Sequence, residues 1–236
     1  MELQDTNAQP GLRERKKQRT RELIAETARR LFLERGFDGV TVAEIAREAE
    51  VAEKTVFNYF PSKEDLVYWR LESFEAEMLQ AVRDRKPGES VLAAFGRFVL
   101  EPRGLLAERD PEARERLTAL TRMISDSPAL LAREQQIFAR YTESLAALIA
   151  EETGTDEEDV EPWVAANALM GVHRRLVDHT RRRILAGGQG RRLAREVRAQ
   201  GRRALSALER GLGGYAVKQP DDPEATPRMP APARSA

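Results

Sequence analysis

Apolar residues recur at intervals of three and four positions along most of the chain, and no segment alternates long enough to indicate a β-strand. Ala, Leu, Glu and Arg, which favour helices, dominate the composition. We therefore predict an all-α protein. The first helix is expected from about Leu12 to Arg35, and Gly36 in the sequence RGFDGV is placed to cap its C-terminus. Its buried face is predicted to contain Ile24, Ala28, Leu31 and Phe32.

The next segment indicates two short helices. The sequence TVAE predicts a capping box, in which the Thr41 hydroxyl accepts from the Glu44 amide and the Glu44 side chain reaches back. After this brief second helix, the sequence VAEKTVFNYF at residues 51–60 is expected to form the third. The sequence SKED at 62–65 then caps a long fourth helix that continues to KPGES at 86–90.

Turn-forming sequences divide the rest of the chain into several more helices. These breaks are EPRG, RDP, SDSP, ETGTDEE and AGGQG. The last two helices are expected from about Asp156 to Ala186 and from about Arg191 to Gly211. The segment 213–236 is rich in Pro and Asp and has few large apolar residues, so we predict a disordered tail there.

Composition removes most enzyme chemistries. The 236 residues are 41% hydrophobic, which is enough for a substantial core. The chain has no cysteine and only two histidines, His173 and His179, and it carries neither a GxGxxG nor a Walker-type loop. We therefore expect no enzyme activity, no cofactor and no metal site. With no apolar run of about 18 residues and no signal peptide, the protein is expected to be cytoplasmic and not bound to membranes.

Charge is balanced overall but unevenly distributed. Residues 11–35 contain nine Lys or Arg against four Glu. Residues 151–161, EETGTDEEDVE, are strongly acidic, whereas residues 171–210 are strongly basic. Either basic block could meet phosphate, so charge alone does not identify a nucleic-acid surface.

The third predicted helix has two chemically different faces. At about 100° per residue, one side carries polar and aromatic groups and the other is apolar. The first side contains Lys54, Thr55, Asn58 and Tyr59, and the second contains Val56 and Phe60. Two short helices joined by a tight turn form a helix-turn-helix, whose second helix enters the DNA major groove. Lys donates to guanine or phosphate and Asn pairs with adenine, although an ordinary surface helix whose aromatics cover a neighbour has the same periodicity.

The stretch LIAETARRLFLERGFDGVTVAEIAREAEVAEKTVFNYFPSKEDLV resembles the N-terminal domain of TetR-type transcriptional regulators, over roughly residues 17–70. The resemblance implies an all-α homodimer with a three-helix DNA-binding head and a larger helical domain that binds a small molecule and dimerises through its last two long helices. The implied organisation is a disordered arm at 1–12, a helix-turn-helix domain at 13–62 with its motif at about 41–60, and an effector-binding and dimerisation domain at 63–212.

The resemblance also implies DNA contacts at particular positions. Residues at the start of the second helix meet phosphate, the third helix faces the groove, and a lysine at the start of the fourth contacts phosphate. These residues are Thr41, Val42, Ala43, Lys54, Thr55, Asn58, Tyr59 and Lys63. Three positions depart from the family pattern: Glu50 replaces the usual turn Gly, Ala52 replaces the common Ser N-cap, and Phe57 replaces the common Tyr.

The effector site is less sharply indicated. Aromatic and apolar residues at helical spacing are candidates to line a ligand cavity, although ordinary core packing produces the same pattern. The candidates are Phe98, Met123, Phe138, Tyr141, Trp163, Asn167 and Met170. The sequence ALMGVHRR resembles the members of the family that bind acyl-CoA-like effectors, so the nearby arginines are candidates to hold CoA phosphates. As a plainer alternative, these arginines form a solvated face that pairs with the acidic residues 151–161.

The predicted function is a sequence-specific DNA-binding regulator. We expect a homodimeric repressor on a near-palindromic double-stranded operator, released by a small-molecule effector that is unidentified or acyl-CoA-like. Two alternatives stay open: an activator or dual regulator on the same scaffold, and a non-DNA-binding helical interaction protein, which Glu50, Ala52 and Phe57 leave possible.

Overall fold

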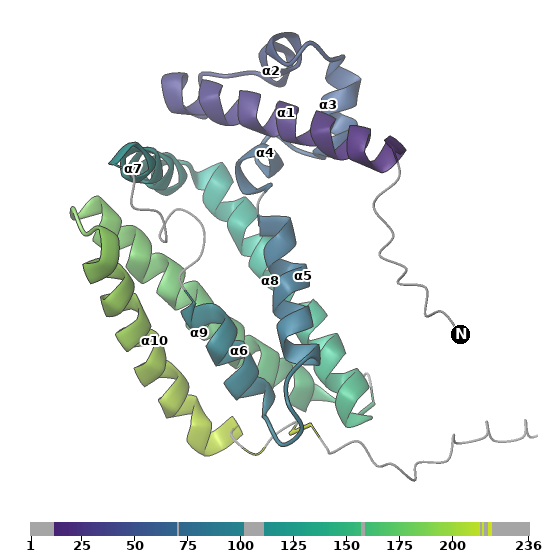
Figure 1. The fold of residues 1–236 in the computed structure, drawn as a ribbon, viewed down its shortest axis with the longest axis vertical. Coiled ribbons are helices and arrows are strands. Elements are labelled where there is room, and N and C mark those ends of the chain that lie inside the picture. The colour runs from purple at the N-terminus through teal and green to yellow at the C-terminus, as the bar shows by residue number, and fades with distance from the viewer. Residues whose placement is uncertain are drawn as a thin grey trace, which may run out of the picture.

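A computed structural model describes residues 12–69, 71–101, 111–156, 159–212, 214 and 217–218. Within these ranges the chain forms ten α-helices (Figure 1). They are α1 (Leu12–Arg35), α2 (Val42–Glu48), α3 (Glu53–Tyr59), α4 (Asp65–Tyr68), α5 (Leu71–Arg83), α6 (Val91–Leu100), α7 (Pro111–Asp126), α8 (Pro128–Thr153), α9 (Val160–Leu185) and α10 (Gly190–Leu212). None of these helices is long and apolar enough to cross a lipid bilayer.

Helices α1, α2 and α3 form a small head whose apolar core is continuous with that of the rest of the protein. The predicted end of α1 is confirmed, since Gly36 has φ +78° and its amide donates to the Phe32 carbonyl at 2.9 Å. The predicted capping box is confirmed too: the Glu44 amide donates to the Thr41 hydroxyl at 3.2 Å, and the Thr41 amide donates to the Glu44 carboxylate at 2.8 Å. Ile45, buried on α2, anchors that helix on the core of the head. Local capping therefore sets the start of α2 and packing sets its orientation.

Helices α5 to α10 form a larger body below the head, and α4 lies between the two (Figure 1). The long helices α8 and α9 pack on each other, α10 packs on α9 and α6, and α5 packs on α6 and α8. Two leucine side chains pack closely onto α10 at Gly201. A Cβ atom at this position would lie 2.4 Å from Leu100 Cδ2 and 3.1 Å from Leu176 Cδ1, so a larger residue would require these side chains to shift.

The predicted long fourth helix is wrong as a continuous element. The segment instead forms α4 and then α5, which points in a different direction in Figure 1. The cap at its start is present, because the Asp65 carboxylate accepts from both the amide and the hydroxyl of Ser62, at 3.0 and 2.8 Å. The physical reason for the division is that α4 packs on α1 of the head, whereas α5 packs on α6 and α8 of the body.

The predicted disordered tail is wrong for its described part. Val217 forms an antiparallel bridge with Ser90 in the loop between α5 and α6. The Gly88 amide donates to the Lys218 carbonyl at 2.7 Å, and the Lys218 ammonium donates to the Arg83 carbonyl at 3.0 Å. Extended backbone at 217–218 thus satisfies hydrogen-bonding groups that this loop would otherwise leave to water. The rest of the predicted tail, and the predicted N-terminal arm before Leu12, lie outside the described residues.

Candidate nucleic-acid interface

Helix α3 presents the two faces that its sequence predicted. Val56 and Phe60 are each 1% exposed and belong to the core of the head. Lys54 and Asn58 are exposed on the opposite side. Thr55 and Tyr59 are partly buried at the edge between the two faces. The apolar side of α3 therefore fixes the helix on the core, and the opposite side exposes the Lys54 ammonium and the Asn58 amide to solvent.

The turn between α2 and α3 is strained. Glu50 has φ +54°, the left-handed region that costs a residue with a Cβ about 1–2 kcal/mol. Its amide donates to the Arg47 carbonyl at 3.2 Å, and the Val51 amide donates to Ala46 at 2.9 Å, so the turn is closed by its own hydrogen bonds. Ala52 caps α3 without a side-chain hydrogen bond. The helix-turn-helix geometry is thus kept without the glycine and the hydroxyl cap that would favour it.

The start of α2 is polar and accessible. Thr41 and Ala43 are exposed and Val42 is partly buried. The Thr41 hydroxyl donates to Glu44 at 2.8 Å, so any phosphate bound by this hydroxyl must compete with that bond. The backbone hydrogen bond from Thr41 and the side-chain bond from Arg35 lower the pKa of Glu44 to about 2. Glu44 therefore stays ionised and holds this end of the helix in place.

The side chain of Lys63 folds back against the head instead of projecting into solvent. Its Nζ is 4.2 Å from the ring centroid of Phe37 and 5.9 Å from that of Phe32. Partial burial lowers the pKa of Lys63, and the nearby charges of Asp38 and Glu64 act in the opposite direction. In this position the ammonium is held over an aromatic face, and a phosphate contact requires it to swing outward.

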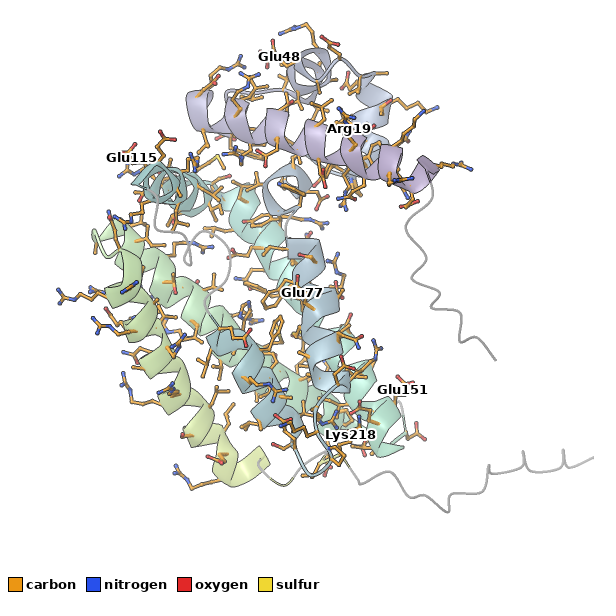
Figure 2. All side chains as sticks on the ribbon, in the orientation of Figure 1. Arg19, Glu48, Glu77, Glu115, Glu151 and Lys218 are labelled. Atoms are coloured by element: carbon orange, nitrogen blue, oxygen red, sulfur yellow. The ribbon has the colours of Figure 1, made fainter. Side chains whose placement is uncertain are left out.

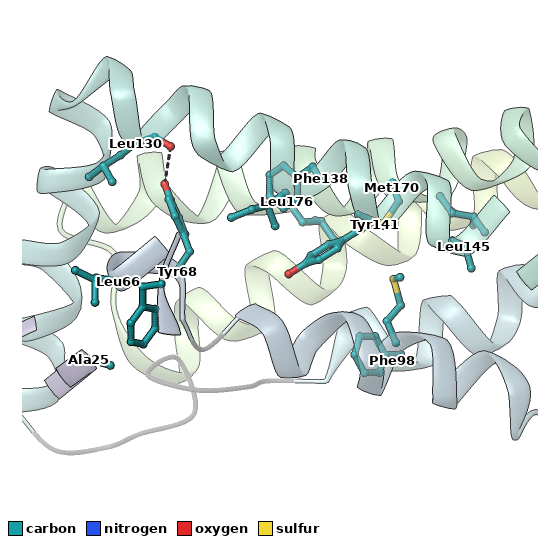
Figure 3. Packing of buried hydrophobic residues seen from close by; sticks show 14 of the residues in the cluster. Ala25, Leu66, Tyr68, Phe98, Leu130, Phe138, Tyr141, Leu145, Met170 and Leu176 are labelled. Carbon is teal, nitrogen blue, oxygen red and sulfur yellow. Dashed lines mark hydrogen bonds between the residues drawn. The ribbon is translucent and has the colours of Figure 1, made fainter. Parts of the chain in front are cut away.

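Four of the predicted effector residues come together in the body. Phe98, Phe138, Tyr141 and Met170 are all buried, and Figure 3 shows them facing one another from α6, α8 and α9. Met123, on α7, is partly buried against the same core. Burial of this kind fits both a ligand cavity and ordinary core packing, so the role of these residues in binding an effector stays a prediction.

The centre of this aromatic cluster is a pair of rings whose stacking the sequence did not predict. The rings of Phe74 and His173 are stacked with centroids 4.7 Å apart and an interplanar angle of 24°. Phe98, Phe138 and Tyr141 surround the pair, with the Phe74–Phe98 centroids 5.1 Å apart and Phe138–His173 5.6 Å apart. Burial lowers the pKa of His173 to about 4, so the imidazole is neutral at pH 7. The spacing of three from Met170 was the available signal for this histidine.

Two predicted effector residues do not belong to this cluster. Trp163 is 45% exposed and donates from its indole nitrogen to Glu143 at 3.1 Å, and Asn167 is exposed on the outer side of α9. The prediction that they face a cavity is wrong. The buried arc of α9 ends at Met170, and both residues lie within about 60° of it on the helical wheel but on the solvent side.

The head and body are joined by hydrogen bonds from α4 to α8. Arg133 on α8 contacts Asp65 at 2.7 and 2.8 Å, and the Tyr68 hydroxyl donates to the Leu130 carbonyl at 2.9 Å (Figure 3). Burial, with a smaller contribution from the charge of Glu134, raises the pKa of Tyr68, so the hydroxyl stays a donor. The sequence offered no signal for these pairs, because the partners are more than sixty positions apart.

Two arginines of the run on α9 form ion pairs inside the body. The run consists of Arg174, Arg175, Arg181, Arg182 and Arg183. Arg181 lies 2.5 Å from the buried Glu134 on α8, and Arg183 lies 2.9 Å from Glu196 on α10. The prediction that residues 151–161 pair with this run is wrong for these two arginines. Their partners come from neighbouring helices packed on the same stretch of α9.

Comparison with known proteins agrees with this architecture. Residues 24–68 match the model described as bacterial regulatory proteins, tetR family, and residues 89–212 match the MftR C-terminal domain. The HTH-type transcriptional regulator TcmR of Streptomyces glaucescens is 32% identical over 152 residues, which cover 64% of this chain and 67% of TcmR. MftR of Mycobacterium tuberculosis is 28% identical over 173 residues, covering 70% of this chain and 81% of MftR.

Among solved structures, FadR from Bacillus subtilis in complex with stearoyl-CoA has a TM-score of 0.49 at 19% identity, over 79% of this chain and 96% of FadR. The two matched models together extend from the helix-turn-helix through α10, and the second alone covers more than half of the chain. The chain therefore belongs to the tetR family of bacterial regulatory proteins, and it is a DNA-binding transcriptional regulator.

Proposed function

We propose that this regulator binds a near-palindromic operator as a homodimer, with α3 of each head in the major groove, and that a small molecule bound in the body releases it. The observation that carries the proposal is the two-faced α3: Lys54 and Asn58 are exposed while Val56 and Phe60 lie in the core of the head. A helix fixed on one side and polar on the other is what base recognition in a groove requires.

The exposed residues have distinct roles in this proposal. Lys54 donates to guanine acceptors and Asn58 pairs with adenine, so these two carry sequence discrimination. Thr55 and Tyr59, at the edges of α3, contact phosphates through their hydroxyls. The start of α2 and Lys63 add further phosphate contacts, and the basic α1, whose Arg19 projects from its surface in Figure 2, adds attraction that does not depend on sequence.

The proposed dimer forms through the outer sides of α9 and α10. Val160, Trp163 and Val164 are 70%, 45% and 53% exposed and lie close together on one side of α9. Continuous exposed apolar surface of this kind marks an interface in a chain that is otherwise highly charged. Figure 2 shows nitrogen-tipped side chains along the outer side of α10, which restrict the apolar part of the interface to α9. A two-fold axis through this surface pairs each α9 with its copy.

The proposed effector site is the aromatic cluster around Phe74 and His173. Its rings and its neutral imidazole favour an uncharged, apolar ligand with a flat or extended shape. An acyl-CoA is less well supported, because Arg181 and Arg183 are already paired with Glu134 and Glu196. We propose repression as the mode of regulation, with activation as the alternative at the promoter.

Selection of bound DNA from a random pool tests the DNA-binding part of the proposal. The expected product is a near-palindrome whose half-site centres are about 34–36 Å apart, or a multiple of it. Lys54→Ala and Asn58→Ala should each weaken operator binding by about 1–3 kcal/mol and leave binding to random duplex nearly unchanged. Lys63→Ala is the matched control: it should weaken both DNAs and reduce the salt slope by about 0.9. Equal losses on both DNAs for Lys54→Ala would contradict base reading.

The release mechanism has a separate test. A compound found by thermal-shift screening is titrated against the dimer with and without operator DNA. Because coupling is reciprocal, operator DNA should weaken binding of the compound by the same factor by which the compound weakens operator binding. The coupling free energy is typically about 1–3 kcal/mol. Identical affinities in the two titrations would contradict a ligand-released repressor while leaving DNA binding intact.

A further inference from the structure

One large apolar side chain on α3, that of Phe57, lies outside the buried core. Phe57 is 46% exposed, although it lies between the buried Val56 and the exposed Asn58. It is not a member of the buried cluster of the head, and within the described residues its ring stacks on no aromatic ring and on no cation. Burial of this ring against a partner would be favourable, because it would remove exposed apolar surface from water.

The position of Phe57 on α3 indicates which partner. On the helical wheel it lies about 60° from Lys54, at one flank of the side that faces DNA in the proposed complex. A phenyl ring has no hydrogen-bond donor for phosphate. Among the base edges exposed in the major groove, the thymine C5-methyl group is the apolar feature that a phenyl ring can bury.

We propose that Phe57 reads a thymine, by packing its ring on the C5-methyl group of one thymine in each half-site beside the bases that Lys54 and Asn58 contact. This inference rests on the proposed binding of operator DNA by α3. It adds a specificity determinant that makes no hydrogen bond, and it assigns a role to the position where the hydroxyl common in the family is absent.

The test removes the methyl group from the DNA instead of from the protein. Each thymine of the selected operator is replaced in turn by deoxyuridine, symmetrically in both half-sites, and affinity is measured by fluorescence anisotropy with the full chain. One buried methyl group is worth about 0.8 kcal/mol, which corresponds to about fourfold in affinity per half-site and about fifteenfold for both. The wild type should show this loss at one symmetric pair of thymines.

The variant Phe57→Ala removes the phenyl ring from the protein side of the same contact. It should bind the thymine and deoxyuridine operators with equal affinity, whereas Phe57→Leu should keep part of the difference. Leu23→Ala is the matched control, because Leu23 is a similarly exposed apolar residue, 51%, on α1, which does not enter the groove in the proposed complex. It should keep the full response of the wild type to deoxyuridine.

The outcomes separate this inference from the proposed function. A wild type that selects no DNA sequence would overturn both. A wild type that binds its operator tightly but loses no affinity at any deoxyuridine, or loses as much as Phe57→Ala does, would overturn the thymine contact alone. Since Phe57 is outside the core of the head, Phe57→Ala should unfold at the same denaturant concentration as the wild type, which excludes misfolding as the cause.

Discussion

The carboxylate of Asp65 accepts hydrogen bonds from Ser62, which follows α3 of the head, and from Arg133, which lies on α8 of the body. One oxygen, Oδ1, accepts from Arg133 on α8, with Nε at 2.8 Å and Nη2 at 2.7 Å. The other oxygen, Oδ2, accepts from the Ser62 amide at 3.0 Å and from its hydroxyl at 2.8 Å. A single buried side chain thus connects the segment that follows the recognition helix to the long helix of the body.

Replacing Asp65 with Asn should loosen this junction. The charge-assisted bonds to Arg133 are lost in a partly buried site, so the free energy of unfolding should fall by about 1–3 kcal/mol. Operator affinity should fall as well, because the two heads are less well held at the spacing of successive grooves. Urea denaturation measures the first effect and fluorescence anisotropy on the operator measures the second.

The control for this variant is Glu75→Gln. Glu75 on α5 accepts from Arg140 at 3.0 Å and from Ser144 at 2.6 Å, both on α8. These bonds connect two helices of the body and do not involve the head. This variant should lose stability and keep its operator affinity. If the two variants lose operator affinity equally, Asp65 has no special role in holding the head.

Relief of backbone strain should stabilise the turn before α3. Glu50→Gly permits φ +54° without a Cβ clash, and the gain is expected to exceed the extra entropy of the unfolded chain by about 0.5–1 kcal/mol. The midpoint of urea denaturation should rise accordingly. Glu50→Ala removes the same charge but keeps the strain, so it should show no such rise. A gain of equal size in both variants would assign the effect to charge.

The partly buried His173 predicts a loss of stability in mild acid. The folded pKa of His173 is about 4, below the usual 6.5, so the unfolded chain takes up the proton first as pH falls. Stability should be unaffected above pH 6.5 and should decline between pH 6.5 and 4, by about 3 kcal/mol at most.

Comparison of two histidine variants isolates this effect. His173→Phe keeps an aromatic ring against Phe74 and should remove that part of the pH dependence. His179→Gln should leave it in place, since His179 is paired with Glu196 at the contact between α9 and α10. Denaturation midpoints of both variants are measured from pH 7 to pH 4. If the midpoint of His173→Phe falls with pH as steeply as that of the wild type, His173 is not the cause of the pH dependence.

The exposed apolar surface of α9, formed by Val160, Trp163 and Val164, should control the oligomeric state. Trp163→Glu places a charge in the proposed apolar interface and should convert the dimer to a monomer in sedimentation velocity. Operator affinity should then fall steeply, because a single head contacts one half-site. Ala76→Glu adds the same charge at an exposed position of α5 and should leave the dimer intact. A dimer that survives Trp163→Glu would place the interface elsewhere.

Local chemistry of the sequence was sufficient for the head. The Thr41–Glu44 capping box, the cap at Gly36 and the polar and apolar sides of α3 each depend on residues within a few positions of one another, so they can be predicted without knowing what packs where. The strain at Glu50 is different, because the sequence shows only that a residue with a Cβ replaces the usual turn Gly, and the structure shows that this residue keeps φ +54°.

The tertiary structure decided the features that depend on distant partners. Periodicity alone places Asn167 and Met170 on nearly the same side of α9, and only the packing of α8 and the other helices of the body determines that Met170 is buried and Asn167 exposed. Arg181 pairs with Glu134, 47 positions away, and Arg133 with Asp65, 68 positions away. Packing of α4 on the head and of α5 on the body likewise divides a segment that the sequence predicts as one helix. Helical propensity acts along the chain, whereas burial and ion pairing act between segments that only the fold brings together.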